Sequence, residues 1–395
     1  MVSFALANDG AAFVLYKVNK TYLKVSIPVN EPLLDGNEKR YLNECIDTGW
    51  ISSEGPFVQR LEHEFASRVG RRFGIAVSNG SVALDAAVKA LNIGPGDEVI
   101  LPAFTIISCA AAVVRAGATL VLVDSQPDTW NMDVEEVEQK ITSRTRAVMP
   151  VHTYGLPVDM NALLAVTRPR GIAIIEDAAE VHGQTCDGRP CGSFGDVSTF
   201  SFYPNKHVTT GEGGIIVTDD EKLAERCRDL RNLCFRSPRR FVHEELGWNF
   251  RMSNLQAALG CAQLERLDSF VERKRNMGRR YTELLAGTPG VQMPLVRTKL
   301  AENIYWVYGL VLEDSIPFDA EEAMRRLSSR GIGCRPFFWP MHEQPVFRRM
   351  GLFENCRFPV AERLARRGFY VPSGLAITES QILRVAETVR EVLKQ

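Results

Sequence analysis

The sequence Ile172-Ala173-Ile174-Ile175-Glu176-Asp177 is an apolar run that ends on two carboxylates, and it predicts a buried β-strand. Similar runs occur on both sides of it, at Glu98–Pro102, Thr119–Asp124, Ala147–His152, Val197–Tyr203 and Gly214–Thr218. Helical patterns lie between several of these runs, at Ser81–Asn92, Ser108–Ala116, Val134–Ile141 and Met160–Val166. Apolar strands separated by helices predict an α/β domain, with a mostly parallel sheet covered on both faces. Such sheets bind ligands at the carboxyl ends of their strands.

The chain beyond Leu230 has a different pattern. Two long amphipathic helices are expected at Asn254–Leu267 and Ser269–Leu285. Shorter elements follow, at Tyr305–Leu312 (strand), Ala320–Arg330 (helix), Arg335–Pro345 (a loop rich in Pro and aromatic residues) and Glu379–Leu393 (helix). We therefore predict an N-terminal extension at 1–24, a large α/β domain at 25–265 and a small α+β domain at 266–395. The first helix of the large domain could pack with the small one.

The composition is that of an ordinary globular protein. The 395 residues include 47 Lys and Arg against 48 Asp and Glu, and 45% are hydrophobic. The net charge of −1 gives no reason to expect a nucleic acid or a membrane surface as a partner. Apolar stretches are too short to span a bilayer. Nine cysteines without a CxxC pattern indicate reduced thiols, so we expect a cytoplasmic protein.

A lysine follows the apolar strand in Phe200-Ser201-Phe202-Tyr203-Pro204-Asn205-Lys206. Burial at this turn would lower the pKa of the amine and leave it able to form a Schiff base. Ser201 and the glycines of Thr209–Gly214 could help to hold a phosphate. A solvated loop lysine is the ordinary alternative, which this segment alone does not exclude.

Asp177 closes its strand and is expected at the carboxyl edge of the sheet. A buried carboxylate there needs a cationic or hydrogen-bonding partner. The pyridine nitrogen of pyridoxal phosphate is such a partner, because an acid beside it keeps the ring an electron sink. The alternative is a cap of the next helix.

The segment Ser78-Asn79-Gly80-Ser81 precedes a helical pattern. Small residues at a helix start leave N–H groups directed at an anion, and the helix dipole assists. An ordinary N-cap explains the same residues. The combination is more informative, since one pyridoxal phosphate would use a phosphate-binding helix start, an acid after one strand and a lysine after another.

Together, these segments resemble the DegT-type nucleotide-sugar aminotransferases, a branch of the fold-type I pyridoxal phosphate enzymes. The resemblance extends from about Val25 to the end of the chain. It includes further segments in the same order, Gly49–Ser53, Gly94–Val99, Glu176–Glu180, Thr209–Gly214 and Trp248–Met252. It implies a mostly parallel seven-stranded sheet between helices, a smaller α+β C-terminal domain and pyridoxal 5'-phosphate as cofactor.

The resemblance also implies a reaction. An amino group would move from glutamate to a keto group of a nucleotide-linked sugar, for a cell-surface polysaccharide or a glycoside. The segment from Asn205 to Gly214 and the pair Arg239-Arg240 are most similar to members that aminate a 4-keto-6-deoxy sugar, so we expect C4 as the position, with C3 as the alternative. Relatives with His at the lysine position carry out dehydration, whereas here Lys206 implies an aminotransferase.

The family pattern assigns roles to matching positions. Lys206 would bind the cofactor and carry the proton, and Asp177 would pair with the pyridine nitrogen. Glu180, where many relatives have Gln, would lie near the ring hydroxyl. The residues that would bind the phosphate are Gly80, Ser81, Ser201 and, from the partner subunit of a homodimer, Asn249. Ile106 stands where most relatives place an aromatic ring over the cofactor, and Phe104 could compensate for it.

Weaker signals concern the substrate. His152 and Tyr154 follow a strand and could reach the sugar, or could be purely structural. Arg239 and Arg240 could bind the diphosphate, although a solvated charge pair is slightly favoured. His342 lies in a loop that relatives use near the substrate.

The sequence leaves two other functions open. Another fold-type I reaction, such as that of a lyase or a desulfurase, is one alternative, and a catalytically idle regulatory relative is the other. We expect no metal, because His63 and His243 have no matching ligands at metal spacing.

Overall fold

The computed structural model describes residues 2–6, 12–18, 21–25, 27–235 and 239–394. A seven-stranded sheet has the order β4-β12-β11-β8-β7-β5-β6. Strand β12 is antiparallel to both of its neighbours, and the other strands of this sheet run in one direction. Their bounds are β4 (Phe73–Val77), β5 (Glu98–Pro102), β6 (Thr119–Val123), β7 (Thr145–Val148), β8 (Ala173–Asp177), β11 (Val197–Ser201) and β12 (Gly214–Thr218). The predicted sheet is confirmed.

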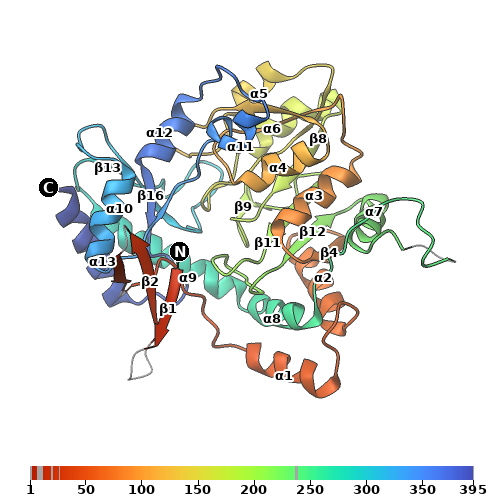
Figure 1. Cartoon of the computed structure of the whole chain (residues 1–395), viewed down its shortest axis with the longest axis horizontal. Helices are drawn as coiled ribbons and strands as arrows, with labels where there is room; N and C mark the ends of the chain where they lie inside the picture. The colour runs from red at the N-terminus through yellow and green to blue at the C-terminus, as the bar shows by residue number, and fades with distance from the viewer. Residues whose placement is uncertain (1, 7–11, 19–20, 26, 236–238, 395) are drawn as a thin grey trace.

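Helices cover both faces of this sheet (Figure 1). One face packs against α3 (Gly80–Ala90), α4 (Ile107–Arg115) and α7 (Glu221–Arg231). The other packs against α2 (Pro56–Arg68), α5 (Val134–Lys140), α6 (Met160–Thr167) and α8 (Asn254–Leu264). In β8, Ile175 belongs to the first of these two cores and Ile174 to the second, as the alternation of side chains along a strand requires.

One strand ends earlier than its apolar run. The strand expected at Ala147–His152 is observed as β7, which ends at Val148. Pro150 has no N–H to donate to a ladder, and an isolated bridge then joins Val151 to Asp177. His152 therefore belongs to the loop after the strand.

A second, antiparallel sheet has the order β13-β14-β16-β15. Its strands are β13 (Val291–Gln292), β14 (Tyr308–Leu312), β15 (Arg335–Pro336) and β16 (Gly368–Val371). The helices α9 (Leu267–Leu285), α10 (Ala320–Ser329) and α13 (Glu379–Leu393) share an apolar core with it. Strand β14 begins three residues later than expected, because the chain bends at Tyr305, which has a φ of 48°.

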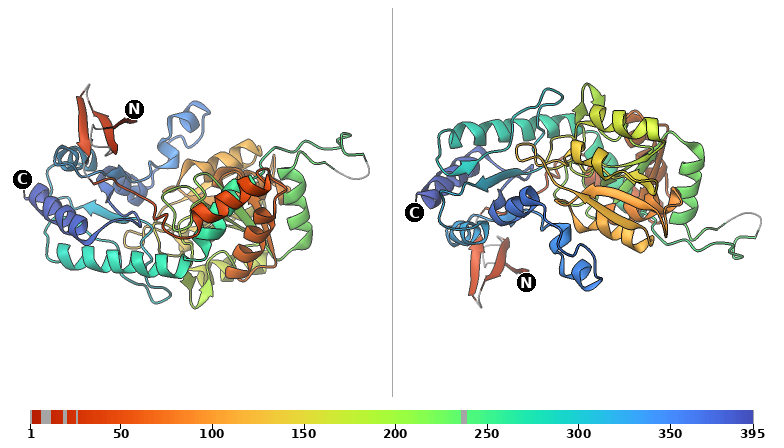
Figure 2. Two further views of the ribbon diagram at one scale, coloured as in Figure 1. Left: turned by 90° about the horizontal axis from the view of Figure 1, so that it is seen from below. Right: turned by 90° about the horizontal axis from the view of Figure 1, so that it is seen from above.

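The N-terminal segment forms a three-stranded antiparallel sheet of β1 (Val2–Leu6), β2 (Ala12–Val18) and β3 (Thr21–Val25). This sheet lies beside the second sheet and away from the seven-stranded one (Figure 2). The helix α1 (Glu38–Thr48) packs against α8, one of the helices that cover the seven-stranded sheet. The two boundaries between the three predicted domains remain predictions. In the described part of the chain, no helix combines the length and the apolar character needed to cross a membrane.

Candidate active site

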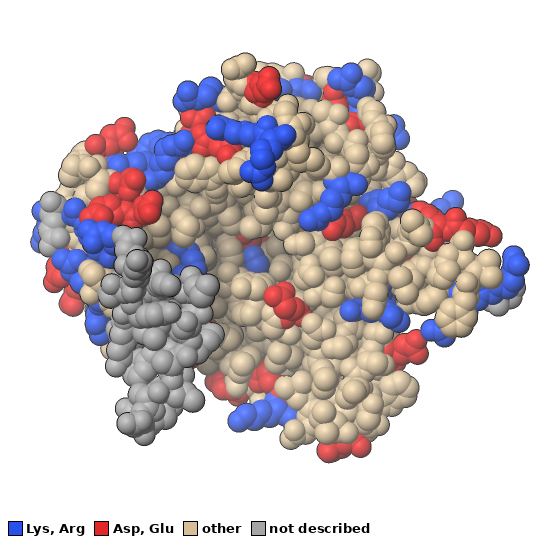
Figure 3. Space-filling view, viewed as in Figure 1, with Lys and Arg blue, Asp and Glu red and all other residues tan. Residues whose placement is uncertain are grey.

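A cavity of about 580 Å³ opens at the carboxyl ends of β8 and β11, beside the start of α3. The surface is hollowed in this region, near the centre of the space-filling view (Figure 3). Four parts of the fold line the cavity. The start of α3 contributes Asn79, Gly80, Ser81 and Leu84, and the start of α4 contributes Ile106 and Ser108. The strands of the large sheet and the loops after them contribute Val151, Asp177, Ala179, Glu180, Thr199, Phe200, Ser201, Tyr203, Asn205, Lys206 and Glu212, and the segments around the second sheet contribute Trp306, Phe338 and Tyr370.

Lys206 extends into this cavity from the turn after β11. The turn is closed by a hydrogen bond from the Lys206 N–H to the carbonyl of Tyr203 (2.9 Å). The side chain is 9% exposed, and its Nζ lies 3.7 Å from Glu180 Oε1. Burial lowers the pKa of Lys206, although the nearby carboxylates of Glu180 and Asp177 favour its charged form. A lysine in this setting is available as a neutral amine nucleophile.

Asp177 is the last residue of β8 and is buried. Its Oδ1 accepts a hydrogen bond from the Ala179 N–H (3.1 Å), and its Oδ2 accepts one from the Cys109 thiol (3.1 Å). Burial raises the pKa of Asp177, and these two hydrogen bonds oppose that shift. Residues 178–184 form turns, so Asp177 does not cap an α-helix. It is a buried carboxylate at the cavity wall that a cationic ligand would stabilise.

Glu180 faces Lys206 across the cavity. Its Oε2 accepts a hydrogen bond from the Tyr154 N–H (2.9 Å), which leaves Oε1 directed at the lysine. Burial raises the pKa of Glu180 to about 7, against the attraction of Lys206. Burial thus brings the pKa values of the two groups towards each other, upward for Glu180 and downward for Lys206.

The start of α3 supplies a site for an anion. Asn79 caps the helix by accepting a hydrogen bond from the Val82 N–H (3.0 Å). A Cβ atom on Gly80 would lie 2.7 Å from Ser201 Cβ, so only glycine lets the helix start this close to β11. Ser81 shares a hydrogen bond of 2.7 Å with Ser108, and all four of Asn79, Gly80, Ser81 and Ser201 line the cavity.

Comparison with known proteins shows which protein family has this arrangement of side chains. A model of the DegT/DnrJ/EryC1/StrS aminotransferase family matches residues 32–390. The chain belongs to this family. It is 41% identical over 368 residues to the GDP-perosamine synthase of Caulobacter vibrioides, and 39% identical over 365 residues to that of Escherichia coli O157:H7. These alignments cover 93% and 92% of the chain, and 98% of each relative.

A solved structure agrees with this membership. The PLP-form of the putative sugar aminotransferase Spr1654 from Streptococcus pneumoniae superposes with a TM-score of 0.87 at 26% identity, covering 93% of this chain and 98% of that one. The expectation of a pyridoxal phosphate-dependent aminotransferase is therefore confirmed.

The cavity of this aminotransferase fits the cofactor. The helix start at Gly80, with the hydroxyls of Ser81 and Ser201 beside it, suits a phosphate group. The Asp177 carboxylate suits a protonated ring nitrogen, and the Lys206 amine suits an aldehyde. These are the residues that the sequence predicted for the three parts of the cofactor.

Ile106 lines the cavity and is 40% exposed, whereas Phe104 is fully buried. Phe104 packs against the rings of Tyr154, Phe337 and Phe338. Ile106 is thus the side chain that faces the ligand space, and Phe104 belongs to the wall behind it.

Three aromatic residues of the cavity were not predicted. Trp306, Phe338 and Tyr370 come from the segments around the second sheet, more than 95 residues beyond Lys206 in the sequence in each case. The aromatic loop predicted at Arg335–Pro345 contains Phe338 but neither Trp306 nor Tyr370, and its pattern indicates a loop without indicating what the loop faces.

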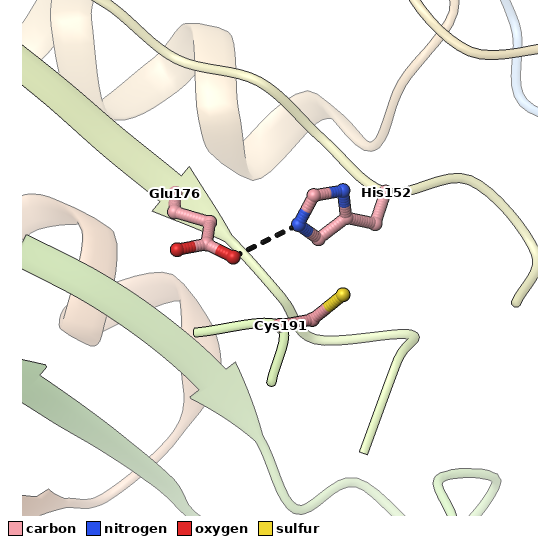
Figure 4. A group of neighbouring side chains, drawn as sticks. All are labelled: His152, Glu176 and Cys191. Atoms are coloured by element: carbon pink, nitrogen blue, oxygen red, sulfur yellow. Dashed lines mark hydrogen bonds and ion pairs between the residues drawn. The ribbon is translucent and has the colours of Figure 1, made fainter. Parts of the chain in front are cut away.

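His152 and Tyr154 lie behind the cavity wall. The His152 ring is fully buried, with Nε2 at 3.0 Å from Glu176 Oε1 and Nδ1 accepting a hydrogen bond from the Val158 N–H (3.0 Å) (Figure 4). No ring nitrogen is left for a sugar, so the structural alternative is the one supported for His152. Tyr154 acts through its N–H, which holds Glu180, while its ring packs in the interior.

His152, Glu176 and Cys191 also form a group with the spacing of metal ligands. Both Glu176 oxygens already accept hydrogen bonds, from His152 and from the N–H groups and the hydroxyl of the loop Gly192–Ser198. Burial opposes ionisation of Glu176, but these bonds outweigh it and lower the pKa to about 2. We interpret this carboxylate as the anchor of the loop and assign no metal to it.

The remaining predicted residues lie outside the cavity of their own chain. His342 is buried beside Glu362 (Nε2···Oε1 3.1 Å) at a separate cavity of about 500 Å³. Arg239 and Arg240 are exposed in the segment 239–247, which projects from the body of the molecule (Figure 2). Asn249 is exposed at the base of that loop, and its Oδ1 accepts a hydrogen bond from Arg251 (2.9 Å).

Proposed function

We propose that this aminotransferase moves an amino group from glutamate to C4 of a nucleotide-linked 4-keto-6-deoxy sugar, as a step towards a cell-surface polysaccharide or glycoside. The observation that carries the proposal is the Lys206–Glu180 pair beside Asp177, in a chain that shares about two fifths of its residues with GDP-perosamine synthases. We infer a cytoplasmic location from the nine cysteines, all of which are free thiols.

The cofactor would supply an electron sink for the carbon that exchanges its proton. Lys206 would hold the cofactor at its aldehyde carbon and would take up and return the proton, because its amine lies inside the cavity with a lowered pKa. Asp177 keeps the ring nitrogen protonated. Gly80, Ser81 and Ser201 bind the phosphate, and Glu180 lies near the ring hydroxyl.

A homodimer with shared sites belongs to the same proposal. Asn249 is exposed and lies outside the cavity of its own chain, which is the placement that a phosphate contact across an interface needs. Arg239 and Arg240 lie on the same projecting loop and are proposed to bind the diphosphate of the sugar nucleotide in the partner's site. His342 is proposed to support the substrate loop through its contact with Glu362.

The test is a panel of GDP- and dTDP-linked keto-6-deoxy sugars, offered with glutamate to the purified enzyme. We expect 2-oxoglutarate to form in equal amount with an amino sugar whose nitrogen is on C4, as located by NMR. Amination at C3 would replace the proposed position, and no transfer with any member of the panel would contradict the proposed substrate class.

A further inference from the structure

A tryptophan outside the predicted site contacts the reactive amine. Lys206 Nζ lies 3.7 Å from the centre of the Trp306 ring, within the distance of a cation–π contact. The indole N–H of the same residue donates a hydrogen bond to the carbonyl of Asn205 (2.8 Å), which directly precedes the lysine. Trp306 therefore holds both the side chain and the backbone of the lysine turn, and only 4% of its surface is exposed.

The segment that carries Trp306 is bent. Tyr305 has a φ of 48°, in the left-handed region that large side chains rarely adopt. Its N–H donates to Asn303 Oδ1 (2.7 Å), and the Asn303 side chain is itself buried. Gly155 lies against this bend, and a Cβ on it would come within 2.6 Å of the Tyr305 nitrogen. Strain of this kind persists only where the surroundings hold it, and it is often found at functional sites.

A buried lysine, Lys274, forms hydrogen bonds on the other side of this bend. Lys274 of α9 is 2% exposed, and its Nζ donates hydrogen bonds to the carbonyls of Trp306 (2.8 Å) and Ser373. Among the described residues no carboxylate forms an ion pair with it. Burial alone lowers the pKa of Lys274 to about 7. An uncompensated buried lysine is costly, so its presence needs a reason.

We propose that Trp306 positions the Lys206 amine and stabilises its charged form, and that Lys274 is a positioning residue that holds Trp306 in place. In the proposed reaction the lysine must hold a proton between two transfers, and the face of the indole favours the form that holds it. The inference rests on the proposed role of Lys206. Trp306 thereby joins the layer of the second sheet to the lysine turn of the first.

The titratable groups around the lysine stay unchanged in the variants that test this idea. They are Asp177 at the end of β8, Glu180 after it, Cys109 on α4, and the buried His182 and His207. Of these, His207 also faces Lys274.

The experiment follows capture of pyridoxal 5'-phosphate by the full-length, cofactor-free protein. The rate at which the visible band forms depends on the neutral fraction of Lys206, so its pH midpoint reports the pKa of that amine. Trp306→Leu should lower the midpoint by about half to one pH unit. Trp306→Phe keeps a ring and should give a smaller shift. Lys274→Met should shift the midpoint in the same direction, because the indole loses its anchor.

The matched control is Tyr281→Phe. The Tyr281 hydroxyl also joins α9 to the chain directly after β16, by donating a hydrogen bond to the Pro372 carbonyl (2.9 Å). This hydrogen bond does not involve Trp306. It should leave the midpoint unchanged. If Lys274→Met does not fold, Asn303→Ala loosens the same bend from its other side and must give the same direction of shift.

Two results would overturn the inference: a wild-type midpoint in Trp306→Leu, or equal shifts in Lys274→Met and Tyr281→Phe. Failure of the proposed role of Lys206 is distinguishable, because the wild-type protein would then form no band that borohydride can trap on Lys206. Failure of the proposed substrate class would show only in the sugar panel and would leave this band and its pH midpoint unchanged.

Discussion

At the scale of single residues, the chemistry depends on one amine. Lys206 is the lysine that the cavity buries beside two carboxyl groups, and Lys206→Ala removes the group that holds the cofactor and moves the proton. We expect amination to fall by about 10³-fold or more while thermal unfolding stays near that of the wild type. Lys222→Ala, on the exposed face of α7, is the matched control and should keep full activity. Glutamate-dependent turnover in the purified Lys206→Ala variant would exclude the assignment.

Glu180 gives a prediction about pH. Its pKa rises from 4.5 to about 7 on folding, so the folded state favours the protonated carboxyl. This contribution to stability is full below about pH 4.5 and is lost as the pH rises to about 7. In Glu180→Gln the side chain is neutral throughout. Across this pH range the unfolding free energy of the cofactor-free wild type should fall by about 1–3 kcal/mol more than that of the cofactor-free variant, as measured by denaturant titration. Parallel pH curves for the two proteins would mean that the pKa of Glu180 is the same in the folded and the unfolded state.

At the scale of helices and strands, the distance between α3 and β11 is set by a glycine. In Gly80→Ala the new Cβ would meet Ser201 Cβ at 2.7 Å, and such overpacking costs about 1–3 kcal/mol. We expect the helix start to move away from the strand and the cofactor to bind about tenfold more weakly, as measured by titration of the visible band. Gly94→Ala is the control, because its Cβ would make only an ordinary contact at 3.7 Å. Unchanged affinity in Gly80→Ala would show that the phosphate does not depend on this helix start.

Site residues at the ends of helices and strands could be predicted from the sequence. Lys206, Asp177 and Gly80 each lie within a few residues of a strand or helix end, and parallel strands bring such ends to one edge, so local patterns were sufficient to place them. Trp306 and Tyr370 reach the cavity through packing between two layers of the fold. Contacts of that kind depend on how sheets are placed relative to each other, which no local pattern records.

His152 is a residue for which the local sequence pattern left a ligand-binding and a structural role open. Its place after an apolar run favoured a ligand-facing position as much as a structural one. The structure uses both of its ring nitrogens to hold Glu176 and the Val158 backbone. A sequence cannot distinguish these uses, because the two groups that occupy the His152 ring nitrogens come from β8 and from Val158, six residues further along the chain.

At the scale of the whole molecule, the segments 239–248 and 50–51 expose apolar side chains. Phe241 is 79% and Leu246 is 86% exposed, and Trp50, Ile51 and Trp248 are also exposed. Large exposed apolar side chains of this kind are typical of a surface that another protein covers. Asn249 lies between Trp248 and Phe250, whose rings stack on each other. A second copy of the chain is the occupant that the proposed shared site requires.

Subunit mixing tests this arrangement directly. Asn249→Asp should weaken cofactor binding, because the new charge repels the phosphate, and Lys206→Ala removes the amine. If Asn249 serves the partner's site, a mixed dimer of these two inactive variants has one site with both defects and one site with neither. Random pairing after joint unfolding and refolding makes half of the dimers mixed, so activity should recover to about a quarter of the wild-type value. The control is the double variant, in which every site is defective and mixing with either single variant restores nothing beyond that variant alone. Mixed dimers that form but show no activity would place Asn249 in the site of its own chain, or outside both.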